Sequence, residues 1–349
     1  MKREMAMTKP TMQDLAEATG VSRVTVWKAL TNRPGVSQEV RQAVRQRAEE
    51  MGVLPEQAER AAGRERTFSV VVSRPESSMF WMQIIHHIAK ELTRNGISLL
   101  YTYMPTAWRK GYVLPASLQP DSVDGFIVLN VYDDNLLRLL AGQGVPKVFL
   151  DTVPGLRPPE LSGDLVILEG RSRVREITRR LLETGHRRLG FLGDVAYAQT
   201  NTDRYQGFLD AHEELGLACD PAFSLTSPLS LRSHYEEISR FLDGLPVLPD
   251  GFVCASDFIA HFVHRYLQES DREPRERFVL TGFDNNLEYA NVAEQITTVG
   301  VETAALGQRL ARMLMFRADY PDAPYEVTYV GTDVIYRGDL ARAGRNGHS

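Results

Sequence analysis

Apolar residues recur at helical spacing in three short stretches near the start of the chain. The stretch over residues 12–18 predicts a helix with one apolar face, and Gly20 ends it. Ser22 is a good N-cap for a second helix that runs to about residue 30, and Ser37 for a third with apolar residues at i, i+4, i+8 and i+11. Two short helices joined by a glycine turn predict a helix-turn-helix, whose core the third helix closes.

From Phe68 onward, short apolar runs alternate with amphipathic helical stretches. The predicted strands are 68–72, 97–101, 126–129, 147–150, 189–192, 251–255 and 278–281, and the predicted helices are 82–95, 173–183, 203–215 and 258–269. Strands that alternate with helices are typical of parallel sheets with helical crossovers. Two such series in succession predict two doubly wound α/β lobes behind the all-α head.

The charge distribution separates the start of the chain from the rest. The 349 residues carry a formal net charge of −5. Nine Lys and Arg residues against four acidic ones give residues 1–47 a charge of +5, so the remainder carries −10. A basic head on an acidic body is typical of a protein in which only the head contacts phosphate groups.

Composition argues against several other classes of protein. Hydrophobic residues make up 43% of the chain and charged residues 24%, which is ordinary for globular domains. No apolar run approaches the roughly 20 residues that cross a bilayer, and no apolar signal core follows the N-terminus, so we expect a cytoplasmic protein. Cys219 and Cys254 lie in unrelated contexts, and His261 and His264 have no acidic or cysteine partner at ligand spacing. We therefore expect no metal site and no cofactor.

The predicted helix-turn-helix resembles the DNA-binding head of the lactose-repressor (LacI/GalR) family. The resemblance is carried by KPTMQDLAEATGVS at 9–22, by Thr25-Val26 and by Gly35-Val36-Ser37. It implies that the start of the second helix enters the major groove of duplex DNA. The alternative for three helices of this kind is a module that contacts another protein.

The resemblance implies a set of DNA contacts. Arg23, Val24 and Lys28 are expected at base edges, Thr25, Trp27 and Asn32 at phosphate or sugar, and Thr11 and Ser22 complete the candidate set. The family usually has Ser and Arg where this chain has Trp27 and Lys28. Because Lys lacks the two-pronged guanine contact of Arg, we expect a shifted operator preference.

Residues 56–66 are expected to form a hinge between head and body. In the family this stretch becomes a short helix on operator DNA, and a leucine from each subunit of a dimer wedges into the minor groove. Here Ala61 stands at the place of that leucine, with Ala58 and Ala62 beside it, and two nearby glutamates would repel phosphate groups. We therefore expect weaker DNA bending than relatives produce.

The body resembles the periplasmic-binding-protein-like core of the same family, nearly end to end. Its landmarks are VDGF at 123–126, GVP at 144–146, GHRR at 185–188, ASD at 255–257, GFDN at 282–285 and TTV at 297–299. Several of them lie just past predicted strand ends, which is where ligands of open α/β sheets bind. We therefore expect an effector cleft between two lobes.

In this resemblance the candidate effector-binding residues are Phe80, Trp81, Asp151, Arg204, Ser256, Asp257 and Asp284. Carboxylates and a guanidinium suit a ligand with several hydroxyl groups, and a flat ring can stack on the apolar face of a sugar. We expect a sugar, with purines and phosphorylated metabolites as alternatives. Glu169-Gly170 stands where the family commonly has Asp-Asn, and Ser256 where it has Asn, so two polar contacts differ. The alternative role of Phe80 and Trp81 is in the hydrophobic core.

We expect a helix-turn-helix domain (1–55), the hinge (56–66), a bilobed core (67–340) and a tail (341–349). The N-lobe is expected over about 67–165 and 297–327, and the C-lobe over 166–296 and 328–340. Lobe closure can change the spacing of two heads only in a dimer, so we expect a homodimer, or a tetramer, on a pseudo-palindromic operator. Effector binding would then raise or lower the affinity for the operator.

Two other functions share parts of this pattern. A solute-binding protein of a transport system has the same cleft architecture, but the helix-turn-helix and the missing secretion signal argue against it. An enzyme of the doubly wound class would need catalytic groups, and Asp257 with Asp284 is the candidate acid/base pair. We find no phosphate-cradling glycine loop, nucleophile elbow or metal-ligand cluster in the sequence. We therefore expect a transcription regulator, a repressor, and not an enzyme.

Overall fold

The computed structural model describes residues 12–30, 35–51, 66–74, 78–230, 233–272, 274 and 276–343. The chain divides into two compact units, residues 1–66 and 67–349. Of the expected functional residues, Thr11, Asn32, Ala58, Ala61 and Ala62 lie outside the described ranges, as does most of the expected hinge. Within those ranges no helix is both long and apolar enough to span a bilayer.

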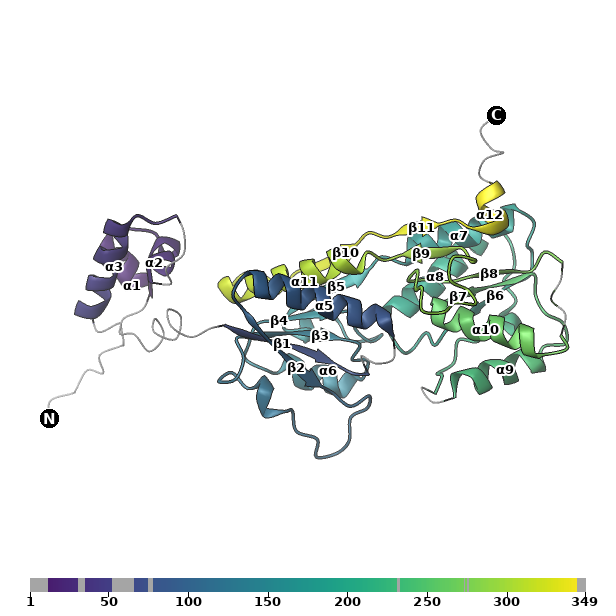
Figure 1. Ribbon diagram of the computed structural model, residues 1–349, viewed down its shortest axis with the longest axis horizontal. Coiled ribbons are helices and arrows are strands. Elements are labelled where there is room, and N and C mark those ends of the chain that lie inside the picture. The colour runs from purple at the N-terminus through teal and green to yellow at the C-terminus, as the bar shows by residue number, and fades with distance from the viewer. Residues whose placement is uncertain are drawn as a thin grey trace. The chain divides into compact units, whose positions relative to one another are not determined.

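The first unit contains three helices, α1 (Met12–Thr19), α2 (Arg23–Leu30) and α3 (Gln38–Glu50) (Figure 1). Gly20, with φ of +66°, allows the tight turn between α1 and α2. The hydroxyl oxygen of Ser22 accepts a hydrogen bond from the backbone N–H of Thr25 (3.1 Å), and Ser37 caps α3 in the same way through Val40 (3.3 Å). The predicted helix-turn-helix is confirmed.

One small hydrophobic core holds these helices together. Its buried residues are Leu15, Ala16, Val26, Ala29, Leu30, Val44 and Ala48. Burial of the α2 residues among them fixes the inward face of that helix and leaves Arg23 and Val24 exposed. Because α2 contributes to a core shared with α1 and α3, its orientation depends on both.

The second unit begins with a six-stranded sheet, here called the N-lobe sheet, whose strands pair in parallel. The order across it is β10 (Val327–Val330), β5 (Asp164–Leu168), β4 (Lys147–Leu150), β3 (Gly125–Leu129), β1 (Thr67–Val72) and β2 (Ser98–Tyr103). Helices α5 (Met79–Arg94) and α11 (Thr303–Asp319) cover one face, and α6 (Asp134–Ala141) covers the other (Figure 1). Each face has its own hydrophobic core, as a doubly wound sheet requires.

A three-stranded parallel sheet forms the C-lobe, in the order β6 (Leu189–Leu192), β7 (Gly251–Cys254) and β8 (Val279–Thr281). Helices α7 (Arg171–Glu183) and α8 (Gln199–Glu214) pack on one face, and α9 (His234–Gly244) and α10 (Asp257–Glu269) on the other (Figure 1). Beside this sheet β9 (Thr298–Gly300) pairs antiparallel with β11 (Asp333–Ile335), and α12 (Gly338–Ala343) follows. Short 3-10 helices span Ala116–Leu118, Pro158–Leu161 and Pro221–Phe223. The predicted pair of α/β lobes is confirmed.

The chain crosses between the lobes a few residues away from the expected boundaries. β5 and β10 lie wholly in the N-lobe sheet, whereas the sequence-based boundaries placed 166–168 and 328–330 in the C-lobe. Residues 298–300 pair with β11 beside the C-lobe sheet, not with the N-lobe. β5 and β10 lie in the same sheet because they pair with each other. The sequence did not indicate this, since a continuous apolar run gives no information about which sheet it joins.

A buried ion pair fixes the β10 edge of the N-lobe sheet. Arg317 on α11 donates from Nε (3.0 Å) and Nη2 (2.6 Å) to the two carboxylate oxygens of Asp164 on β5. Asp164 also accepts from the backbone N–H of Glu326 (2.8 Å), just before β10. Arg317 and Asp164 are each 2% exposed, so the pair ties α11 to β5 in a region that water does not reach.

Candidate functional site

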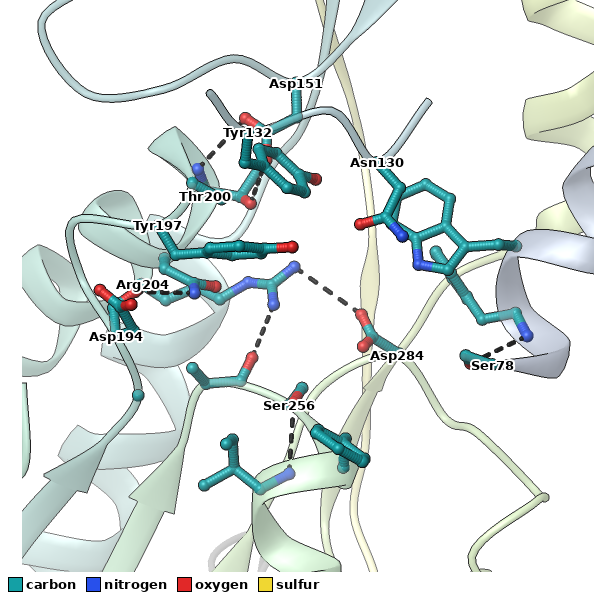
Figure 2. A pocket seen from close by; sticks show the side chains of 18 of the residues that line it. Ser78, Asn130, Tyr132, Asp151, Asp194, Tyr197, Thr200, Arg204, Ser256 and Asp284 are labelled. Carbon is teal, nitrogen blue, oxygen red and sulfur yellow. Dashed lines mark hydrogen bonds and ion pairs between the residues drawn. The ribbon is translucent and has the colours of Figure 1, made fainter. Parts of the chain in front are cut away.

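A cavity of about 310 Å³ lies beyond the carboxyl ends of strands from both lobes (Figure 2). Six of the seven candidate effector-binding residues line it, and they are Phe80, Trp81, Asp151, Arg204, Ser256 and Asp284. Other polar and aromatic residues of the lining are Arg74, Ser78, Asn130, Tyr132, Asp194, Tyr197, Thr200, Asn201, His234, Phe258, Asn286 and Tyr289. The cavity thus combines carboxylate, guanidinium and amide groups with aromatic rings at the place where ligands of open α/β sheets bind.

Asp151 connects the two lobes beside this cavity. It follows β4 and is 5% exposed. Its Oδ2 accepts a hydrogen bond from the hydroxyl of Thr200 on α8 (2.5 Å), and its Oδ1 accepts one from the backbone N–H of Thr200 (3.3 Å) (Figure 2). Oδ1 also accepts a hydrogen bond from the backbone N–H of Thr152 (2.8 Å). Burial raises the pKa of Asp151 to about 6, while these hydrogen bonds oppose the rise. Because Thr200 belongs to the C-lobe, this hydrogen bond requires the two lobes to be together.

Arg204 on α8 is held against the wall of the cavity. Its Nη1 donates to the backbone oxygen of Ala255 (2.6 Å), and its guanidinium carbon lies 3.5 Å from the centre of the Phe283 ring. Gly170 leaves room for this side chain, since a Cβ at that position would lie 3.0 Å from Cγ of Arg204. Nε is buried without a hydrogen-bond partner among the residues that the structure describes. A guanidinium fixed in this way can donate to the oxygens of a ligand.

Asp284 supplies the second carboxylate of the cavity. It follows β8 in a left-handed backbone conformation, with φ of +101°. Its Oδ1 lies 3.7 Å from Nη2 of Arg204 (Figure 2). Burial raises the pKa of Asp284 to about 7, the positive charge of Arg204 opposes the rise, and the negative charge of Asp257 adds to it. The carboxyl group of Asp284 therefore titrates near neutral pH.

Asp257 requires a correction, because it does not line the cavity. Its Oδ1 accepts a hydrogen bond from the hydroxyl of Thr298 (2.7 Å), and its Oδ2 accepts one from the backbone N–H of Asn286 (2.7 Å). Its side chain is buried, at 3% exposure. With both oxygens bonded to the protein, Asp257 positions the loop that carries Asp284 instead of contacting a ligand.

Ser256 lines the cavity and also begins α10. Its hydroxyl oxygen accepts a hydrogen bond from the backbone N–H of Ile259 (3.3 Å), which is an N-cap (Figure 2). The residue is half-buried. Since a hydroxyl oxygen can accept from the helix and still donate its own hydrogen, Ser256 can serve both the helix and a ligand.

Aromatic side chains enclose the polar groups. Tyr132, after β3, and Tyr197, before α8, have ring centres 4.6 Å apart and come from different lobes (Figure 2). The rings of Phe80 and Trp81 meet edge to face, with their centres 5.2 Å apart. Both residues line the cavity and also pack in the N-lobe core, so each has the two roles that were expected as alternatives. Sequence reasoning missed Tyr132 and Tyr197. Their positions just past strand ends were the available signal.

Two hydrogen bonds join the start of α5 to the loop after β8. Asn286 donates from Nδ2 to the hydroxyl oxygen of Ser78 (3.0 Å), and the backbone N–H of Met79 donates to Glu288 (2.9 Å). Ser78 and Asn286 both line the cavity. Together with the hydrogen bond between Thr200 and Asp151, these contacts hold the lobes against each other around the cavity.

The candidate DNA contacts that the structure describes lie on α2 or directly before it. Arg23 and Val24 are exposed at the start of the helix, and Val24 has 47% of its surface open to solvent. The hydroxyl of Thr25 lies 2.8 Å from that of Ser22, so both are engaged in the capping turn. Trp27 and Lys28 are half-buried on the following turn. The arrangement offers one helix end, with a cation and an apolar side chain, to a groove.

Metal binding has no obvious place in the part of the chain that the structure describes. No three His, Cys, Asp or Glu side chains gather there in a group that could hold an ion. His261 Nδ1 lies 2.5 Å from the amide oxygen of Asn291, and His264 Nδ1 lies 3.3 Å from its nitrogen. These histidines are therefore engaged with an amide.

Two family models match the sequence. The model described as bacterial regulatory proteins, lacI family, matches residues 11–56, and that of the periplasmic binding protein-like domain matches residues 178–338. The regulator CelR of Thermobifida fusca is 27% identical over 322 residues, which cover 88% of this chain and 92% of CelR. The repressor PurR of Mannheimia succiniciproducens is 26% identical over 95% of this chain and 99% of its own length.

Solved structures share the fold over nearly the whole chain. A transcriptional regulator CelR–cellobiose complex superposes with a TM-score of 0.67 at 25% identity, covering 94% of this chain and 99% of that one. A lac repressor dimer bound to operator and the anti-inducer ONPF gives a TM-score of 0.65 at 20% identity, covering 95% and 98%, and this likeness shows the fold alone. The chain thus carries the DNA-binding head of the lacI family of bacterial regulatory proteins ahead of a periplasmic-binding-protein-like body, and HTH-type regulators are similar to it over more than nine-tenths of their length. It is a DNA-binding transcription regulator.

Proposed function

We propose that this regulator is a homodimeric repressor and that a carbohydrate in the cavity between the lobes controls its affinity for operator DNA. The effector class rests on one observation, the convergence of Asp151, Arg204 and Asp284 on a cavity that aromatic rings also line. Acceptors and a forked donor at fixed positions suit the hydroxyl groups of a sugar. Aromatic rings suit its apolar faces.

A disaccharide is the first ligand to test. The cavity, at about 310 Å³, is near the lower limit of small-molecule sites, which span roughly 300–1,000 Å³. The similar CelR structure is a complex with cellobiose. Phosphorylated metabolites fit less well, because the carboxylates of Asp151, Asp194 and Asp284 in the lining would repel a phosphate group.

Binding without turnover is the proposed chemistry of the cavity. An acid/base pair needs two carboxyl groups that both reach the substrate. Asp257, the expected partner of Asp284, has both oxygens bonded to Thr298 and Asn286 and lies outside the lining. The expected pair of Asp257 and Asp284 is therefore not assembled in the cavity. The helix-turn-helix favours a regulator over a hydrolase or a solute-binding protein.

A dimer follows from the way a short helix reads DNA. One head contacts a few base pairs, and two heads on a symmetric operator multiply that discrimination. Lobe closure around the effector would change the spacing of the heads through a hinge, proposed at residues 56–66. A tetramer would pair two such dimers. Because the operator is chromosomal DNA, we propose that the protein acts in the cytoplasm.

The test uses the full-length protein, a saccharide panel that includes cellobiose, and operator fragments obtained by selection from genomic DNA. We expect one saccharide to raise the melting temperature, because a ligand that binds only the folded state stabilises it. The same saccharide should change operator affinity at least about tenfold, which corresponds to about 1.4 kcal/mol of coupling.

Two variants assign the saccharide to the cavity. Asp284→Asn removes a carboxylate from the lining and should weaken saccharide binding at least about tenfold, the scale of a lost charge-assisted hydrogen bond. Glu183→Gln changes an exposed carboxylate of α7 that pairs with Arg179, and should leave saccharide binding unchanged. A panel in which no saccharide shifts melting, while a nucleobase does, would replace the carbohydrate by a purine.

A further inference from the structure

A second cavity, of about 480 Å³, lies in the C-lobe beside β8. It lies toward the amino ends of β6 and β8, since His186 comes just before β6 and Phe278 just before β8. The effector cavity lies beyond the carboxyl ends of the same strands. The two cavities share no lining residue.

The charge of this second cavity has one sign. Arg277 and Arg337 both line it, and no Asp or Glu is among the described residues of its lining. The effector cavity, in contrast, has carboxylates as well as arginines. A ligand that enters the second cavity therefore meets positive charge, with no competing Asp or Glu among the described residues of the wall.

Neutral acceptors hold both guanidinium groups. Arg277 donates from Nη2 to the backbone oxygen of Thr184 (3.0 Å). Arg337 donates to the backbone oxygen of Ile296 (3.1 Å) and to the side-chain oxygen of Asn285 (2.9 Å). Neither arginine forms an ion pair within the described residues, although Asp257, which is not in the lining, attracts Arg337 from a greater distance. The two cations are thus oriented by the protein while most of their charge stays uncompensated.

Two arginines of α7 are, in contrast, neutralised by acidic partners. Arg171 pairs with Asp210 at 2.6 Å, and Arg175 pairs with Glu214 at 3.1 Å. Such pairs neutralise the α7 surface, where another hollow is lined by arginines and glutamates together. Of these two hollows in the described part of the C-lobe, the second cavity is therefore the one whose lining has arginines and no acidic residue.

The rest of the lining is largely apolar. Leu267, Phe278, Leu280, Ile296 and Leu340 contribute hydrophobic side chains, and Gln268 and Gln295 contribute amides. A bare inorganic ion would leave the apolar part of the wall unused, whereas an organic anion would cover it. We propose that this cavity binds a small organic anion, a carboxylate or a phosphate monoester, whose charge is neutralised by Arg277 and Arg337 and whose carbon skeleton packs on Phe278 and Leu280.

The experiment is calorimetric titration of the full-length protein with three probes at low ionic strength. Phenyl phosphate carries both an anionic group and an apolar body, inorganic phosphate carries only the charge, and benzyl alcohol carries only the apolar body. We expect phenyl phosphate to bind at least about tenfold more tightly than inorganic phosphate, because it also buries apolar surface. We expect no measurable heat with benzyl alcohol.

Variants then locate the binding. Arg277→Gln removes an exposed cation from the lining and should weaken phenyl phosphate at least about tenfold, the scale of a charge-assisted contact. Arg179→Gln removes an exposed cation from α7, outside the cavity, and should have no effect. Asp284→Asn alters only the effector cavity, and should also leave phenyl phosphate binding unchanged.

Three results would overturn the proposal. The first is no binding of phenyl phosphate by the wild-type protein at millimolar concentration. The second is equal weakening by Arg277→Gln and Arg179→Gln, which would indicate a general charge effect. The third is displacement of phenyl phosphate by the saccharide that binds the effector cavity, which would place the anion there. Absence of a saccharide effector leaves the first two comparisons intact, so the anion site and the carbohydrate proposal fail separately.

Discussion

The hydroxyl of Thr200 donates a 2.5 Å hydrogen bond to the carboxylate of Asp151, and this bond joins the first turn of α8 in the C-lobe to the end of β4 in the N-lobe. Both residues line the effector cavity. Since Asp151 is buried, loss of this donor would leave a carboxylate oxygen with one fewer partner in a place that water barely reaches. Lobe closure and the state of the cavity are therefore linked at this pair.

Thr200→Val tests that link. The substitution keeps the shape of the side chain and removes the donor. We expect effector affinity to fall at least about tenfold, because a hydrogen bond to a charged group contributes roughly 1.5–3 kcal/mol. Titration of the saccharide into wild-type and variant proteins measures the loss. Thr202→Val is the matched control, because the Thr202 hydroxyl donates to the backbone oxygen of Val195 in the same lobe (2.7 Å) and to no N-lobe residue that the structure describes. Equal losses of effector affinity in both variants would contradict a role for the hydrogen bond between Thr200 and Asp151.

The raised pKa of Asp284, about 7, predicts how stability depends on pH. The folded protein holds the proton of this carboxyl group more tightly than the unfolded chain does. Its contribution to stability is therefore fully present below the ordinary aspartate range, and is lost as pH rises from about 4 to about 7. The slope for one group is at most about 1.4 kcal/mol per pH unit.

Denaturant unfolding at pH 5 and pH 7 measures this dependence. Asp284→Asn cannot titrate, so the difference between wild-type and variant proteins isolates Asp284 from every other group. We expect the variant to lose less stability between the two pH values than the wild type does. Parallel pH profiles would show that the pKa of Asp284 is not raised.

Gly170 provides a test of how Arg204 is positioned. A Cβ on Gly170 would lie 3.0 Å from Cγ of Arg204 and 3.3 Å from the ring of Phe283. We expect Gly170→Ala to displace the guanidinium and weaken effector binding about tenfold, because a misplaced donor loses its aligned contact. Gly244→Ala is the control, since its Cβ would meet nothing within 4 Å. Effector titration of the two variants makes the comparison, and unchanged affinity in Gly170→Ala would show that Arg204 has room to adjust.

The buried ion pair of the N-lobe predicts a large effect on folding. Arg317→Met leaves Asp164 buried and without its cation, and we expect the free energy of unfolding to fall by about 3–5 kcal/mol. Arg317→Met combined with Asp164→Leu removes both charges and should recover part of that loss. Chemical denaturation of the three proteins checks this. A double variant less stable than Arg317→Met would show that the charges were not the main effect.

Periodicity was sufficient to predict the head and most of the β and α segments of the lobes, because burial on one face leaves a repeat in the sequence. It did not predict the helices α6, α9 and α11. It also did not indicate that β5 and β10 are strands of one sheet. The pairing of β10 with β5 joins residues far apart in the chain, and neither segment alone indicates its neighbour.

The candidate site shows a similar limit. Ligands of open α/β sheets bind past strand ends, and this rule together with the family resemblance placed Asp151, Arg204 and Asp284 at the cavity. The rule works because the position of the cavity follows from the topology of the sheets. They did not distinguish Asp257 from Ser256, adjacent residues whose side chains have different partners. The carboxylate of Asp257 is directed by Thr298, 41 positions further along the chain, and such a tertiary partner leaves no local signal.

The exposed end of α2 predicts how the protein reads its operator. Arg23 lies at the first position of the helix, beside the exposed Val24 and ahead of the buried Val26. We expect Arg23→Ala to relax base preference at one position of each half-site, with a loss of discrimination of about 1–3 kcal/mol, because a bidentate contact to one base would be removed. Selection of DNA fragments by the purified variant, followed by sequencing, gives the base profile. Arg45→Ala, an exposed cation on α3, is the control and should preserve the profile even where overall affinity falls. A profile that Arg23→Ala leaves unchanged would remove Arg23 from base recognition and limit it to phosphate contacts.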